Sequence, residues 1–161
     1  MEFREWLGQF RARHDAAKRG ALDASSLSDY HAARDELARA LLAAQRVAIE
    51  PGQQPRRQLR AFRALQVDVA FFDGTLRATT RQLSAGGFSA LLAHAPKVGE
   101  VVKVILRLPG AEPLQAEARV VETKPQAGNA HVSFQWAGLG EDDRERLEVF
   151  VFDAVLDELK V

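Results

Sequence analysis

Cysteine is absent from the 161-residue sequence, which excludes a disulfide framework, a thiolate metal site and a cysteine nucleophile. An excess of either charge is also missing, because 22 lysines and arginines balance 22 aspartates and glutamates. General nucleic-acid binders normally carry a basic face, so this balance argues against that class of partner. A local group of basic residues is still compatible with a small anionic ligand.

Long apolar runs are missing as well. No run approaches the ~20 residues that a membrane-spanning helix needs. The first ten residues, MEFREWLGQF, carry an acidic residue directly after the methionine and lack the apolar core of a signal peptide. We therefore expect a cytoplasmic protein with no membrane insertion, and the absence of cysteine agrees with that compartment.

Signatures of enzymes are equally scarce. No Walker loop, GxSxG motif or Rossmann fingerprint is present, and the four histidines form no HExxH or closely spaced metal set. We expect His14 and His31 at surface positions of helices, and Trp6 and Trp136 in packing roles. The sequence thus predicts no catalytic residue, no metal site and no cofactor.

The first 49 residues predict a helical hairpin. Apolar residues recur at i, i+3, i+4 and i+7 along the first helix, namely at Phe3, Trp6, Leu7 and Phe10. Gly20 is expected to end this helix. A serine N-cap at Ser25, Ser26 or Ser28 is expected to begin the second helix. The hairpin alone cannot bury both apolar stripes, so it must pack on the rest of the chain or form a homodimer.

Residues 50–64 are predicted to be a linker, because Pro51, Gly52 and Pro55 break regular structure. Residues 65–161 then change to a period of two, which is typical of half-buried strands. The strand-like segments are 65–71, 76–81, 88–92, 101–108, 114–122 and 131–136, and a helix follows at 140–159. Six short strands at this spacing predict a small antiparallel barrel or sandwich.

A basic motif lies in the linker. Residues 56–60 read RRQLR, which places Arg56 and Arg60 at RxxxR spacing with Arg57 beside them. Guanidinium forks bind phosphates and the Hoogsteen edge of guanine in a bidentate manner. The simpler interpretation of the same residues is a solvated basic linker.

A second motif lies between two predicted strands. Residues 82–87 read QLSAGG, which matches xxSxxG. Gly86 and Gly87 permit a positive φ or a close approach of the backbone to another group. Ser84 can bond a phosphate, a base edge or its own backbone. Alone this motif is an ordinary turn, and it becomes specific only in combination with the arginine motif ahead of it.

Together the two motifs resemble the signature of the PilZ domain family, RxxxR followed by (Asp/Asn)xSxxG. The likeness continues through the VGEVV run at 98–102, the AEARVVET run at 116–123 and the HVSF run at 131–134, and covers residues 55–157. The resemblance implies a mainly β, α+β fold: a six-stranded antiparallel barrel with a C-terminal helix, here preceded by the N-terminal helical hairpin. It also implies binding of cyclic di-GMP.

The resemblance implies a role for each motif residue. Arg56 and Arg60 would clamp the ligand, with Arg57 assisting as a neighbouring arginine. Ser84 and Gly87 would line the guanine pocket. The expected function is then a non-enzymatic cyclic di-GMP sensor that relays the second messenger to a protein partner through ordering of the linker.

The sequence departs from the family signature at Gln82, where Asp or Asn is usual. A carboxylate there can accept from the N1 and N2 hydrogens of guanine, whereas glutamine offers one carbonyl acceptor and is one methylene longer. This departure keeps open a PilZ-like adaptor that binds protein and no nucleotide. A third alternative is a structural oligomerisation module built from the two N-terminal helices.

Overall fold

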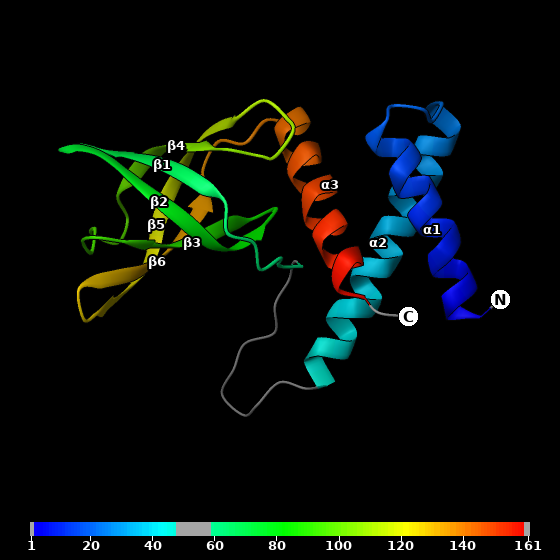
Figure 1. Ribbon diagram of the computed structural model, residues 1–161, viewed down its shortest axis with the longest axis horizontal. Coiled ribbons are helices and arrows are strands. Elements are labelled where there is room, and N and C mark those ends of the chain that lie inside the picture. Colours follow the sequence, from blue (N-terminus) through cyan, green and yellow to red (C-terminus); the bar gives the residue numbers. More distant parts are fainter. Residues whose placement is uncertain (1, 48–58, 160–161) are drawn as a thin grey trace. The chain divides into compact units, whose positions relative to one another are not determined.

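The structure, a computed structural model, describes residues 2–47 and 59–159, and for residues 45–47 the backbone alone (Figure 1). The helices in these ranges are α1 (Phe3–Lys18), α2 (Ala24–Val47) and α3 (Glu141–Glu158). The strands are β1 (Gln66–Phe71), β2 (Gly74–Ser84), β3 (Gly87–Leu92), β4 (Val101–Leu106), β5 (Leu114–Gln126) and β6 (Asn129–Trp136).

The chain divides into two compact units. The barrel unit is Arg60–Val151, and the helical unit combines Met1–Leu59 with Phe152–Val161. The division falls inside α3, so the first half of that helix belongs with the strands and its last residues belong with α1 and α2. The predicted domains place the whole C-terminal helix with the barrel, and those boundaries stay a prediction.

The six strands form a closed antiparallel barrel in the order β1-β2-β3-β6-β5-β4, in which β1 also pairs with β4. This confirms the predicted fold. Alternate residues fill the interior, as at Val67 and Val69 of β1, both of which are fully buried. A bulge between Thr80 and Gln82 shifts the register of β2 against β3, and Gln82 then pairs with Ser89.

The first half of α3 is anchored within the barrel unit. Leu147 and Val151, four residues apart on one helical face, are both buried. Arg146 forms an ion pair with Asp143 at 3.0 Å and donates to the backbone carbonyl of Glu112. The first turn is acidic, from Glu141 to Asp143, which complements the positive end of the helix dipole.

A glycine follows the end of α1, and an aspartate caps the beginning of α2. As predicted, α1 is followed by Gly20, which has a φ of 67°. The predicted serine N-cap of α2 is wrong. The side chain of Asp23 accepts the backbone N–H of Ser26 at 2.7 Å, so the helix begins at Ala24. This carboxylate satisfies a free N–H and also complements the helix dipole, and that hydrogen bond holds the pKa of Asp23 below its usual value.

His14 lies in the core of the helical unit, with 1% of its side chain exposed, and its predicted surface position is wrong. It continues the buried stripe of Leu7 and Phe10 by a further helical turn. Its Nδ1 lies 2.8 Å from the hydroxyl of Tyr30, and its Nε2 lies 3.4 Å from Asp153 Oδ1. The histidine therefore joins α1 to α2 and to the last part of α3 within this unit.

Candidate functional site

The xxSxxG motif forms the tight turn between β2 and β3. β2 ends at Ser84, β3 begins at Gly87, and these two residues pair across the turn. The Ser84 hydroxyl oxygen accepts the backbone N–H groups of Gly86 and Gly87, each at 3.2 Å, and donates to the Gly87 carbonyl at 3.3 Å. Of the three bonding options open to Ser84 in the sequence, the structure shows the bond to its own backbone.

Gly87 is required by a close approach of two strands. A Cβ atom at this position would lie 2.0 Å from the backbone oxygen of Phe134 in β6. Real Cβ atoms never come that close to backbone, so no other residue fits without a shift of β3 or β6. Of the two roles that the sequence allows for Gly87, the structure shows the close approach to another backbone segment. Gly87 does not have a positive φ.

The end of the arginine motif lies directly beside this turn. Ala61 forms an isolated antiparallel bridge with Leu83, closed by two backbone hydrogen bonds of 2.8 and 2.9 Å. One residue earlier, Arg60 is exposed, and its Nη1 donates to Gln82 Oε1 at 3.0 Å. Within the barrel unit the fold therefore brings Arg60 and Gln82, which are 22 residues apart, into one polar site. Arg56 and Arg57 lie outside the described residues.

Aromatic side chains support the turn. Phe88 stacks on Phe134 with a centroid distance of 4.6 Å and contacts Trp136 at 5.1 Å. The indole N–H of Trp136 donates to the backbone carbonyl of Ser84 at 3.4 Å. The half-buried Trp136 thus holds the turn in place, in agreement with its predicted packing role.

Ser89 and Ser133 join the site through strand register, and the sequence analysis missed them. Gln82 pairs with Ser89, Ser89 with Ser133, and Ser133 with Glu122, which makes a polar row across four strands. Ser89 is 5% exposed, and its hydroxyl has no hydrogen-bond partner among the described residues. A buried hydroxyl without a partner costs about 1–3 kcal/mol, so this group favours a ligand or water at the row. The only signal in the sequence was that Ser89 is the single polar residue of the strand-like segment 88–92.

Other chemistry is sparse in the described part of the chain. No group of three or more histidine, aspartate or glutamate side chains within residues 2–47 and 59–159 is placed to hold a metal ion. Over those same residues, no helix is both long and apolar enough to cross a bilayer.

The PilZ domain model matches residues 54–153, which is more than half of the chain. This chain belongs to the PilZ domain family. No curated protein matches its sequence. The matched residues include both motifs, so Arg60 and Gln82 of the polar site both lie within the family signature.

Solved PilZ structures share the fold. The inhibitor of motility MotI/DgrA of Bacillus subtilis has 23% identity and a TM-score of 0.60 over 67% of this chain and 55% of its own. The PilZ domain of YcgR from Escherichia coli, solved with c-di-GMP, has 18% identity and a TM-score of 0.55 over 65% of this chain and 95% of its own. MrkH of K. pneumonia in its apo state has 16% identity and a TM-score of 0.55, over 68% of this chain and 55% of its own. The PilZ chain therefore spans about half the length of MotI/DgrA and MrkH.

Proposed function

We propose that this PilZ protein is a non-enzymatic sensor of cyclic di-GMP that relays ligand binding to a protein partner. The observation that carries the proposal is the contact of Arg60 with Gln82 beside the Ser84–Gly87 turn. It unites a guanidinium fork, an amide and a tight backbone turn, which are groups that bind phosphate and guanine edges. YcgR and MrkH, which share this fold, have each been solved with c-di-GMP.

Arg60 is held in a way that suits exchange onto a ligand. One partner of its guanidinium is the neutral amide oxygen of Gln82, and a hydrogen bond to a neutral acceptor is weaker than one to a carboxylate or phosphate. A ligand phosphate, which is charged, is therefore a stronger acceptor for Arg60 than the Gln82 amide oxygen. Arg56 and Arg57 precede Arg60 by four and three residues and complete the proposed clamp.

The relay follows from the position of the clamp in the chain. Residues 50–64 connect the N-terminal helices to the barrel, so a ligand that fixes the arginines also fixes that connection. The ligand can shift the helices only by the difference between its affinities for the two arrangements. The clamp arginines supply that difference if they meet the ligand only in the docked arrangement of the linker.

Calorimetric titration with cyclic di-GMP tests the sensor. We expect micromolar or tighter affinity, and Arg60→Ala should weaken it roughly tenfold or more, because a bidentate contact is worth about 1–3 kcal/mol. Arg144→Ala is the matched control, since Arg144 is also exposed in the barrel unit and lies in α3 rather than in either motif. Absence of heat at high ligand concentration would refute the sensor.

The second candidate function is a PilZ-like adaptor that binds protein alone. Gln82 favours it, because the position lacks the carboxylate of the family signature. A folded protein that gives no heat with cyclic di-GMP, and unchanged hydrogen exchange at Arg60 and Gln82, would favour this function over the sensor.

A further inference from the structure

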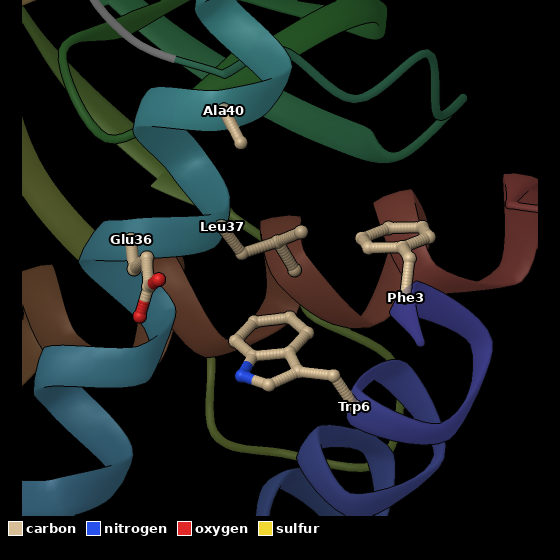
Figure 2. A pocket seen from close by; sticks show the side chains of 5 residues that line it. All are labelled: Phe3, Trp6, Glu36, Leu37 and Ala40. Atoms are coloured by element: carbon tan, nitrogen blue, oxygen red, sulfur yellow. The ribbon is translucent and has the colours of Figure 1, made fainter. Parts of the chain in front are cut away.

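The helical unit contains a pocket that lies outside the PilZ match. Its volume is about 280 Å³, and its walls come from both N-terminal helices. α1 contributes Phe3 and Trp6, and α2 contributes Glu36, Leu37 and Ala40 (Figure 2). The pocket therefore belongs to the part of the chain that distinguishes this protein from a PilZ domain alone.

Helical spacing and residue size shape the pocket. Phe3 and Trp6 lie three residues apart on one face of α1, and their rings stack with a centroid distance of 6.3 Å. Trp6 also stacks on the buried Phe10 at 5.6 Å, which fixes the plane of the indole. Figure 2 shows the Leu37 side chain directed toward the Phe3 ring. Ala40 is too small to fill the remaining space.

The volume limits what can bind. Pockets for small-molecule ligands usually measure about 300–1,000 Å³. The pocket lies just below that range, which is too small for a cyclic dinucleotide and sufficient for one large side chain. Phe3, which forms one wall of the pocket, is half exposed. The volume therefore suits one side chain presented by another protein.

The chemistry of the walls selects a cation with an apolar stem. Four of the five lining residues are apolar, and the fifth is Glu36, whose carboxylate has no ion-pair partner among the side chains that the structure describes. Aromatic faces attract cations, and the planar guanidinium both stacks on indole and forks onto a carboxylate. The same unit already holds Arg34 over the rings of Tyr30 and Phe152, at 5.3 and 5.8 Å.

We propose that this pocket docks an arginine side chain of a partner protein. The guanidinium meets the Trp6 ring and the Glu36 carboxylate, and the aliphatic stem lies along Leu37 and Ala40. Arginine and tryptophan are, with tyrosine, the residues enriched at the energetic centres of protein interfaces. The proposal rests on the proposed function in one respect, since it names the partner chemistry that the relay requires. Docking is tested without nucleotide, so its failure and a failure of cyclic di-GMP binding are separate results.

A displayed peptide library selected on the immobilised full chain tests the proposal. We expect enrichment of arginine flanked by apolar residues. Glu36→Lys should abolish the arginine preference, and Ala40→Trp should block enrichment by filling the pocket. Asp35→Lys is the matched control, because it makes the same charge change at the exposed neighbouring position, outside the pocket lining. Circular dichroism of each variant establishes that the helices are retained.

The affinity of the best enriched peptide gives the quantitative result. Glu36→Lys should weaken it about tenfold, and Asp35→Lys by no more than about twofold, as expected for a remote exposed charge. Peptides without arginine, or equal losses in both lysine variants, would overturn the proposal. A wild-type dimer that Ala40→Trp converts to a monomer in sedimentation would assign the pocket to a second copy and would also overturn it.

Discussion

At the scale of single residues, the site depends on small differences in side-chain chemistry. Gln82 replaces the usual Asp or Asn of the family, and its neutral amide oxygen accepts a hydrogen bond of 3.0 Å from the charged Arg60. Ser84 uses its hydroxyl to shape the turn, while Gly87 is set by the backbone of Phe134. Gln82 and Gly87 can each be changed singly, and each change has a matched control.

Gln82→Asp is expected to tighten cyclic di-GMP binding. The carboxylate would form an exposed ion pair with Arg60 in the free protein, worth about 0.2–1 kcal/mol. Its hydrogen bonds to guanine N–H groups are worth about 1.5–3 kcal/mol, so the ligand should gain more than the free state. Titration calorimetry measures the change, and Gln82→Glu separates the effect of charge from that of length. Unchanged or weaker affinity in the aspartate variant would show that glutamine already fits the pocket.

Gly87→Ala is expected to destabilise the barrel strongly. The new methyl group would lie 2.0 Å from a backbone oxygen, and overpacking against less rigid neighbours already costs about 1–3 kcal/mol. Urea denaturation should show a loss of about 3 kcal/mol or no folded protein. Gly138→Ala is the control, because nothing lies within 4 Å of its Cβ position. Equal stabilities of the two variants would contradict the close approach of β3 and β6.

At the scale of elements, polar contacts join the helices of the helical unit. His14 of α1 contacts Tyr30 of α2 and Asp153 of α3, and Lys18 forms an ion pair with Asp153 at 2.7 Å. Arg11 donates to the backbone carbonyls of Leu156 and Leu159 at 2.8 and 2.9 Å, which caps the end of α3. These contacts make the stability of the unit depend on the charge of one buried imidazole.

Stability is expected to fall below about pH 6.5, the usual pKa of histidine. Burial lowers the pKa of His14, and the neighbouring Asp153 opposes that shift without cancelling it. The unfolded chain therefore binds a proton at a higher pH than the folded one, so stability is complete above the unfolded pKa and is lost as the pH falls toward the folded pKa. Urea denaturation between pH 8 and 5 measures the loss. His14→Gln should flatten this dependence, whereas the exposed His94→Gln should leave it as in the wild type.

At the scale of the whole molecule, the chain combines a PilZ barrel with a helical unit that lies largely outside the family match. The connection between them carries the arginine motif, and α3 contributes residues to both units. In the proposed relay, nucleotide binding at the barrel and arginine docking at the helices are two separate events. The linker is the part of the chain through which one event could bias the other.

Hydrogen exchange across residues 50–63 is expected to slow when cyclic di-GMP is added, because the clamp would fix this segment on the barrel. Exchange in α1 and α2 should change at the same ligand concentration if the relay operates. Mass spectrometry of peptides from wild type and Arg60→Ala gives the comparison, and the variant should show neither effect. Protection of the linker with unchanged helices would mean that the ligand is held without a relay.

The choice of a barrel over a sandwich came from the family resemblance, whereas local patterns along the chain predict the helices, the strands and the PilZ motifs. These features are local: alternation along a strand, helical spacing along α1 and the short runs around Arg60 and Ser84 need no knowledge of distant residues. Strand bounds were less exact, since β2 and β5 extend beyond the predicted segments by up to four residues. Their ends depend on pairing with neighbours rather than on their own pattern.

Which distant groups meet depends on the folded chain and not on local sequence patterns. The Arg60–Gln82 contact joins residues 22 apart, and the Ser89–Ser133 pair depends on the register of β3 with β6. His14 lies on the buried stripe of α1, and helical spacing cannot specify that Tyr30 and Asp153 would be its polar partners there. Periodicity states which face of an element is apolar, while the partner of that face follows from the packing of the whole chain.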